Sequence, residues 1–155
     1  MGFLNLLRGA RIYLDANIWI YFLEGLPLYG QPLNALFEAA DAGSLTLFTS
    51  ELTLAEILVR PTKEGNLNKQ QTYANIITNV NVSTAVPIDR SILIASASLR
   101  ASTKLKLPDA IHAATAIATN CTTFLTNDQQ FRTVSGLHTV LLSQATDESI
   151  NDDGN

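Results

Sequence analysis

The sequence has little cysteine, little histidine and no long apolar run, and each scarcity excludes a class of protein. A single cysteine, Cys121, rules out an internal disulfide and fits a reducing compartment. Two histidines and one cysteine give no cluster of the kind that binds zinc. No apolar run approaches the roughly 20 residues of a membrane span, and the first residues hold only a semi-apolar stretch too short for a signal peptide. We therefore expect a cytoplasmic protein with no contact to a membrane.

An excess of basic charge is also missing. Ten Lys and Arg residues stand against fourteen Asp and Glu residues, a formal net charge of -4. Four of the acids lie close to the end of the chain: Asp147, Glu148, Asp152 and Asp153. Ten acids and ten bases remain in residues 1–146, and such a neutral body lacks the electrostatic footprint of a protein that binds duplex DNA. We predict one domain over residues 1–144 and an acidic, disordered tail over residues 145–155.

Short apolar segments of two kinds alternate along the chain, which is 46% hydrophobic. Strands are expected at residues 11–15, 45–48, 83–88, 123–126 and 138–142. Helices are expected at residues 17–23, 32–42, 51–60, 69–78, 90–101 and 109–119. Pro61 is expected to end the third helix, with a polar loop over residues 62–68. This alternation predicts an α/β fold, in which helices cover both faces of a central, mostly parallel sheet.

Four acidic residues stand at particular places in this pattern. Asp15 ends the first strand, and Asp128 follows the strand at residues 123–126. Asp109 opens an alanine-rich helix, and Glu56 lies inside an apolar helical pattern. Because the carboxyl ends of parallel strands meet at one edge of a sheet, we expect these carboxylates to converge there. Since they would repel each other without a cation, and oxygen ligands suit hard cations, the pattern predicts a site for Mg²⁺ or Mn²⁺.

Each acid alone also has a structural explanation. Asp15 and Asp128 can cap the elements that follow them, and Asp109 suits the positive end of a helix dipole. The helix around Glu56 looks largely buried, so its carboxylate needs a cation or a donor, and no basic partner is indicated nearby. His112, one helical turn beyond Asp109, is expected to be a packed or surface residue rather than a ligand.

Four short motifs carry a resemblance to a known family. They are Tyr13-Leu-Asp15-Ala-Asn17, Leu54-Ala-Glu56-Ile57, Leu107-Pro-Asp109-Ala-Ile-His112 and Phe124-Leu-Thr-Asn127-Asp128. In order and spacing they resemble the acidic motifs of the PIN-domain nucleases, over residues 11–142, and the chain's size resembles the VapC-type toxins. The resemblance implies a three-layer α/β/α sandwich and a Mg²⁺- or Mn²⁺-dependent endoribonuclease, the toxin of a type II toxin–antitoxin pair. It also implies an RNA substrate, a homodimer and inhibition by a small antitoxin protein.

The resemblance assigns roles residue by residue. The catalytic and metal-binding set it implies is Asp15, Glu56, Asp109 and Asp128. Three further matches, Asn17, Ser50 and Thr126, fall at supporting polar positions. Gln130 departs from the pattern, because many relatives have an acid there, and this bears on the binding of a second metal ion. Apart from the resemblance, three cations stand just before Asp109: Arg100, Lys104 and Lys106. Their position lets them flank the site and contact RNA, and an ordinary solvated loop is the alternative explanation.

Other functions stay open at this point. The same fold serves RNA-processing nucleases outside toxin–antitoxin systems, and a non-catalytic interaction module could use the acids as caps. A nucleotide-binding or phosphatase-like domain is disfavoured, because no glycine-rich loop follows the first strand and Asp15 has no paired aspartate. Residues 17–23 and 33–42 carry more large apolar side chains than one sheet face needs, which predicts an interface and favours a homodimer.

Overall fold

A computed structural model describes residues 2–146, so the acidic residues 147–155 lie outside the described part of the chain. Five strands form one sheet: β1 (Arg11–Leu14), β2 (Thr46–Ser50), β3 (Thr84–Val86), β4 (Thr123–Thr126) and β5 (Thr139–Leu141). Six α-helices connect them: α1 (Ala16–Leu23), α2 (Gly30–Asp41), α3 (Glu51–Lys63), α4 (Leu67–Thr78), α5 (Arg90–Ser102) and α6 (Leu107–Ala118). Three 3₁₀ turns are also present, η1 (Phe3–Leu6), η2 (Pro27–Tyr29) and η3 (Gln129–Thr133), and residues 143–146 are helical at the end of the described chain. No helix among the described residues is long and apolar enough to cross a membrane.

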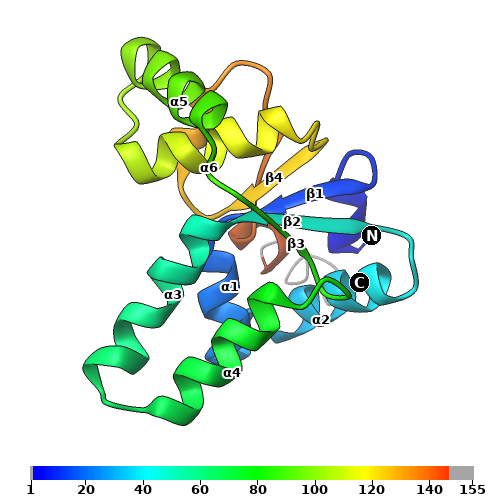
Figure 1. The fold of residues 1–155 in the computed structure, drawn as a ribbon. Coiled ribbons are helices and arrows are strands. Elements are labelled where there is room, and N and C mark those ends of the chain that lie inside the picture. Colours follow the sequence, from blue (N-terminus) through cyan, green and yellow to red (C-terminus); the bar gives the residue numbers. More distant parts are fainter. Residues whose placement is uncertain (1, 147–155) are drawn as a thin grey trace.

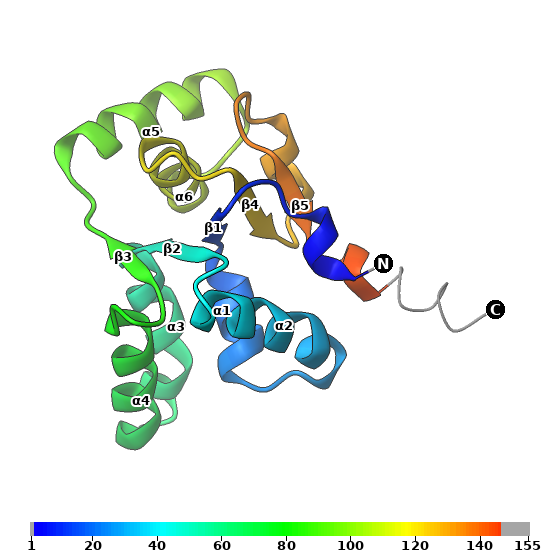
Figure 2. The same cartoon turned by 90° about the vertical axis from the view of Figure 1, so that its right-hand side faces the viewer.

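The sheet is parallel throughout, with strand order β3-β2-β1-β4-β5. Figure 1 shows α5 and α6 on one face and α1 to α4 on the other, and the quarter turn of Figure 2 shows the same three layers. The predicted three-layer α/β/α sandwich is therefore confirmed. The chain moves outward from β1 to β2 and β3, then returns to the other side of β1 as β4. Such a reversal opens a crevice at the carboxyl ends of the strands, which is where α/β proteins place their sites.

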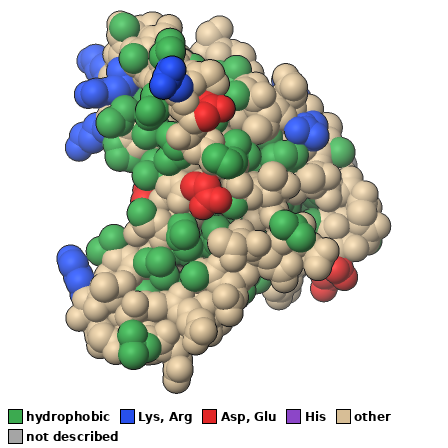
Figure 3. All heavy atoms as spheres, in the orientation of Figure 1, with side chains coloured by type: hydrophobic (Ala, Val, Ile, Leu, Met, Phe, Trp, Pro, Cys, Tyr) green, Lys and Arg blue, Asp and Glu red, His purple; other side chains and the backbone are tan. Residues whose placement is uncertain are grey.

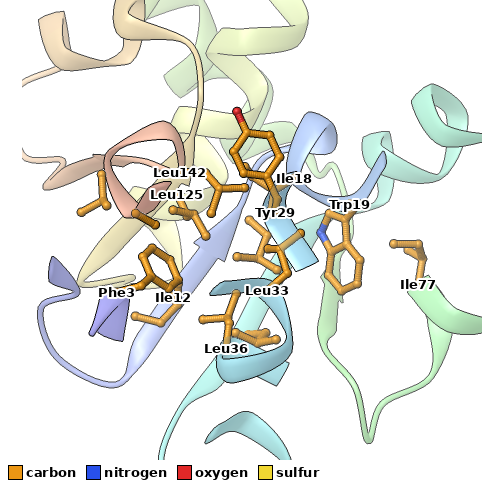
Figure 4. Packing of buried hydrophobic residues seen from close by; sticks show 14 of the residues in the cluster. Phe3, Ile12, Ile18, Trp19, Tyr29, Leu33, Leu36, Ile77, Leu125 and Leu142 are labelled. Carbon is orange, nitrogen blue, oxygen red and sulfur yellow. The ribbon is translucent and has the colours of Figure 1, made fainter. Parts of the chain in front are cut away.

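Alternate side chains of each strand enter two different cores. Ile12, Leu14 and Leu125 face the layer of α1 and α2. Figure 4 shows this core, where side chains from the strands meet Leu33 and Leu36 of α2. On the opposite face Tyr13 and Phe124 pack beneath the alanine side of α6. This alternation with period two is what a parallel sheet buried on both faces requires.

The apolar surplus expected in residues 17–23 and 33–42 is largely absorbed by the first core. Ile18, Trp19, Leu33 and Leu36 are buried, and the other large apolar side chains of these two segments are half-buried. Trp19 is packed in the core, and its ring lies edge-on to Phe37 at 5.5 Å. The most exposed apolar side chains of the described chain therefore lie on other elements.

Pro61 lies inside α3 and does not end it, contrary to the expectation from sequence. A proline in a helix removes one hydrogen bond, here the one to the carbonyl of Ile57. The ladder resumes at once, because the amide of Glu64 donates to the carbonyl of Arg60 at 3.0 Å. The Pro61 ring is buried, and its own carbonyl accepts from the amide of Asn66 at 2.9 Å. The predicted polar loop is thus reduced to the short turn between α3 and α4, and these two helices form a hairpin (Figure 1).

Candidate active site

Asp15 lies between the end of β1 and the start of α1, and it is buried. Its amide donates to the carbonyl of Leu125 at 3.0 Å, which extends the β1–β4 ladder by one residue. Its Oδ1 accepts from the amide of Ala16 at 2.7 Å, so the carboxylate caps α1. The capping role anticipated for Asp15 is therefore real, and it fixes this side chain at the sheet edge.

Thr126, at the end of β4, joins Asp15 to Asp128. Its hydroxyl donates to Oδ2 of Asp15 at 2.7 Å and accepts from the amide of Asp128 at 3.0 Å. The Asp128 carboxylate in turn accepts from the amide of Gln130 at 2.9 Å and starts η3. One fully buried hydroxyl thus links the first and last acids of the set.

Asp109 lies in the first turn of α6, and its side chain is half-buried. Burial raises the pKa of its carboxyl above the ordinary value, and the charges of Asp15 and Asp128 raise it further. Burial likewise raises the pKa of Asp15, while the hydrogen bonds from the Thr126 hydroxyl and the Ala16 amide oppose that rise. Repulsion between the carboxylates was expected at this edge, and the raised pKa values of Asp15 and Asp109 agree with it. Burial is nevertheless the larger cause at both.

Glu56 has the partner that sequence reasoning did not find. Nε2 of His112 lies 2.6 Å from Oε1 of Glu56 and 3.9 Å from Oδ1 of Asp15. The expectation of a largely buried α3 was wrong, because the Glu56 side chain keeps 35% of its exposure and Val59 keeps 51%. Helix α3 belongs to a hairpin that extends away from the sheet, so only part of its surface meets the core (Figure 2).

The polar residues predicted to support the acids take separate places. Ser50 is fully buried and caps α3, where its hydroxyl accepts from the amide of Leu52 at 3.0 Å. Asn17 is exposed in the first turn of α1. The three cations Arg100, Lys104 and Lys106 are all exposed, at the end of α5 and just before α6.

The surface is hollowed between the α5–α6 layer and the α3–α4 hairpin. Figure 3 shows acidic side chains at the base of this hollow and Lys and Arg side chains gathered beside it, over α5 and the start of α6. A negative floor beside a positive rim suits a ligand that carries phosphates together with cations.

The carboxylates have the donor chemistry of a site for a hard divalent cation. All four groups offer oxygen, the ligand that Mg²⁺ and Mn²⁺ prefer. Asp109 responds to the charges of Asp15, Asp128 and Glu56, so the four acids lie within electrostatic reach of one another. Across residues 2–146, no three His, Cys, Asp or Glu side chains are grouped closely enough to hold a metal ion as they stand. Binding one would therefore require carboxylate side chains to rotate inward.

Two further polar residues lie at this edge, Tyr13 and Asn127, and the sequence pattern gave neither a role of its own. The hydroxyl of Tyr13 lies 2.7 Å from Nδ1 of His112. Asn127, beside Asp128, donates to the Tyr29 hydroxyl at 3.1 Å and accepts from the amide of Ser143 at 2.9 Å. The only signal for His112 was its spacing, since residues three apart on a helix share a face. Tyr13 lies in the first family motif, but its place in an apolar strand gave no sign of a polar contact.

A parallel sheet between helical layers, with acids gathered where its strands end, defines an α/β domain with an acidic edge site. This chain belongs to the PIN domain family, whose model matches residues 12–137. The family resemblance of the four motifs is therefore confirmed. No curated protein sequence matches the chain.

Solved structures of toxin–antitoxin proteins share the fold. VapBC2 from Rickettsia felis, bound to a DNA fragment from its promoter, superposes with a TM-score of 0.68 at 21% identity, over 84% of this chain and 98% of that one. A toxin–antitoxin complex from Klebsiella pneumoniae gives a TM-score of 0.62 at 25% identity, over 84% and 97% of the two chains. VapC20 from Mycobacterium tuberculosis, a toxin that cleaves the sarcin–ricin loop, gives 0.63 at 14% identity, over 81% and 95%.

Proposed function

We propose that this protein is a Mg²⁺- or Mn²⁺-dependent endoribonuclease that hydrolyses RNA phosphodiesters, and that it is the toxin of a type II toxin–antitoxin pair. The observation that carries the proposal is the linked set of acids at the sheet edge, where Thr126 joins Asp15 to Asp128 and Asp109 responds to both charges. Membership of the PIN domain family and the structural likeness to toxin–antitoxin proteins support it.

Asp15 and Asp109 are the main ligands that we propose for the cation, with Asp128 and Glu56 completing the set. The cation would supply a Lewis acid that stabilises negative charge on the phosphodiester and helps to activate the attacking water. The Ala16 amide and the Thr126 hydroxyl each occupy one lone pair of the Asp15 carboxylate and hold it in place. Asn17 and Ser50 support the same edge, Asn17 from the exposed first turn of α1 and Ser50 as the cap of α3.

Arg100, Lys104 and Lys106 are the proposed contacts to the RNA backbone. They are exposed, and they precede Asp109 in the sequence, at the end of α5 and just before α6. Contacts to phosphates position a strand without reading its bases. The target sequence must therefore be read elsewhere on the surface.

The partners that we propose are a small antitoxin protein and a second copy of this chain. The structurally similar assembly from Klebsiella pneumoniae is a toxin–antitoxin complex, which supports the first partner. A nuclease of the same fold outside a toxin–antitoxin system would have the same acids but no such inhibitor. Co-expression with the product of a small neighbouring reading frame distinguishes the two, because only an antitoxin would suppress cleavage.

The function is tested by incubating total RNA with the protein in Mn²⁺, Mg²⁺ or EDTA and mapping the new ends. We expect cuts at defined positions with either metal and none in EDTA. Asp109→Asn keeps the volume of the side chain and loses its charge, so cleavage should fall on the order of 10³-fold while the fold is retained. Asp41→Asn, the same change at an exposed acid at the end of α2, is the matched control and should cut normally.

Two results would count against the proposal. Near-normal metal-dependent cleavage by Asp109→Asn would remove this residue from the site. Intact RNA in every metal, from a folded wild-type protein, would favour a non-catalytic interaction module.

A further inference from the structure

The imidazole of His112 is completely enclosed and makes two short polar contacts. Its Nε2 lies 2.6 Å from Oε1 of Glu56 on α3, and its Nδ1 lies 2.7 Å from the hydroxyl of Tyr13 on β1. His112 itself is on α6, so one chain of hydrogen bonds joins three elements of the fold. This series of hydrogen bonds ends at Glu56, one of the acids of the site.

The hydrogens shared by Tyr13, His112 and Glu56 can be placed by asking which atom of each pair donates and which accepts. The Tyr13 side chain is completely buried, and a phenol, with an ordinary pKa of about 10, keeps its proton at neutral pH. A buried hydroxyl needs an acceptor; Nδ1 of His112 lies 2.7 Å away, and Thr49 is a second side-chain partner of this hydroxyl. When Tyr13 donates to Nδ1, Nε2 carries the hydrogen of the ring and donates it to the Glu56 carboxylate. With the opposite tautomer, a bare nitrogen would face a carboxylate oxygen at 2.6 Å.

We propose that Tyr13 and His112 form a positioning relay, in which Tyr13 fixes the tautomer of His112 and His112 holds the Glu56 carboxylate at the site. Neither residue touches RNA in this role. The bond uses Oε1 of Glu56 and leaves Oε2 for a divalent cation. This role rests on the proposed function, since it supposes that Glu56 serves a metal.

The position of Glu56 explains why such a relay is useful. Its side chain keeps 35% of its exposure on a helix hairpin that extends away from the sheet. A glutamate side chain loses rotamer freedom when it is held still, and this loss opposes metal binding. Partners outside the first ligand shell perform this task in many metal sites, and their loss costs roughly 10- to 100-fold in metal affinity or activity.

Packing alone does not explain why Tyr13 has a hydroxyl and why position 112 holds a histidine. The Tyr13 ring stacks on Phe124 at 5.0 Å with an interplanar angle of 6°, a contact that phenylalanine would keep. An apolar side chain in place of His112 would fill the same alanine-lined space. Replacing both partners of a buried hydrogen bond by apolar groups of the same shape is close to neutral for stability. The relay therefore gives the fold little that apolar residues would not.

The first test is the protonation of His112 in the metal-free wild-type protein at pH 7.5. The chain has two histidines, so a ¹⁵N-imidazole spectrum contains two rings. We expect Nε2 of His112 to carry a hydrogen and Nδ1 to be shifted as a hydrogen-bond acceptor. The second ring, His138, lies 3.2 Å from the carbonyl of Leu6 and serves as the internal reference. A hydrogen on Nδ1 of His112, in either the other tautomer or the charged ring, would overturn the relay.

The second test is Mn²⁺ affinity, measured by calorimetry without RNA. His112→Leu should bind Mn²⁺ roughly 10- to 100-fold more weakly. His112→Gln can still present an N–H group to Glu56 and should recover part of the loss. Tyr13→Phe keeps the stacked ring, so it carries the test if His112→Leu does not fold. The matched control, His138→Gln, should bind as tightly as the wild type.

The outcomes separate this inference from the proposed function. Equal Mn²⁺ affinity in the wild type, His112→Leu and Tyr13→Phe would overturn the relay, as would a wild type that binds no Mn²⁺. If the wild type binds Mn²⁺ more tightly than the His112 and Tyr13 variants but leaves RNA intact, only the nuclease proposal is wrong.

Discussion

Asp109 has a half-buried carboxyl within the field of two other acids, and its raised pKa has a consequence for stability. Below the ordinary pKa of an aspartate, about 3.9, the group is neutral in the folded and the unfolded chain. Between that value and the raised pKa of the folded state, the folded chain holds more protons than the unfolded chain. The free energy of unfolding therefore falls as pH rises through this window.

We predict that Asp109→Asn stabilises the metal-free protein at pH 7 and that its advantage shrinks as pH falls toward 4. The variant has no carboxyl to ionise, so it escapes the penalty of a half-buried charge beside Asp15 and Asp128. Thermal unfolding in EDTA across this pH range measures the difference. An Asp109→Asn variant less stable than the wild type at pH 7 would show that this carboxylate is structural.

Asp89 provides a control of opposite sign. Hydrogen bonds from the Ile92 amide and the Ser91 hydroxyl lower the pKa of this exposed cap of α5. A lowered pKa contributes stability that is present above the ordinary value and is lost as pH falls through the folded one. Asp89→Asn should therefore destabilise the protein at pH 7 and converge with the wild type in acid.

At the residue scale, the sequence indicated which acids matter but not what holds them. Asp15 and Asp128 follow strands, and this position alone predicts a sheet-edge site. The contact of Glu56 with His112 joins residues 56 positions apart on two helices. No local sequence pattern encodes the distance between two helices, on opposite faces of a sheet, whose side chains meet at its edge. The pairing became visible only when the packing of α6 was known.

The start of β1 depends on a glycine at the element scale. Gly9 has a φ of +63°, and a Cβ placed there would lie 2.4 Å from Oγ1 of Thr122. The same turn carries paired hydrogen bonds between the backbone of Arg8 and the hydroxyl of Thr123, at 2.7 and 2.8 Å. These contacts register β1 against β4 and thus set the place of Asp15.

We predict that Gly9→Ala destabilises the protein more than Gly25→Ala does. Both glycines have positive φ, at +63° and +64°, but a Cβ on Gly25 would meet open space. Gly25→Ala should cost only the left-handed strain, about 1–2 kcal/mol. Gly9→Ala should add roughly 1–3 kcal/mol for the overlap with Thr122. Urea unfolding of both variants measures the difference, and equal costs would mean that the β1–β4 turn yields without penalty.

The order of strands and helices was predictable, because their apolar patterns have different periods. The residues at which each element begins and ends were less predictable. Pro61 shows why. Proline usually ends a helix because it removes one backbone hydrogen bond. In α3 the Pro61 ring is buried and the following hydrogen bonds are made, so the helix continues to Lys63. Strand β3 is shorter than its apolar run suggested, Thr84–Val86 in place of residues 83–88. It is the edge strand of the sheet, and it pairs with β2 alone.

For the whole molecule, the distribution of charge and apolar surface bears on association. The expected interface on α1 and α2 is mostly used by the core, as the burial of Trp19 and Leu36 shows. Exposed apolar side chains remain on the opposite layer, where Leu93 keeps 48%, Ile94 65% and Leu107 46% of their exposure. Figure 3 shows hydrophobic atoms over α5 and the start of α6, beside the Lys and Arg side chains and above the acidic hollow. A second copy bound here would place two acidic sites beside one shared basic rim.

We predict a homodimer that buries this α5–α6 surface, since exposed apolar patches mark interfaces and two-fold dimers are the commonest closed assembly. Sedimentation at micromolar concentration, without antitoxin or RNA, should show the dimer. Ile94→Glu would place an unpaired charge in the interface and should weaken dimerisation at least roughly 100-fold. Val80→Glu is the matched control, because Val80 is 86% exposed between α4 and β3, and it should leave the dimer intact. A wild type that sediments only as a monomer would leave the α5–α6 surface to the antitoxin.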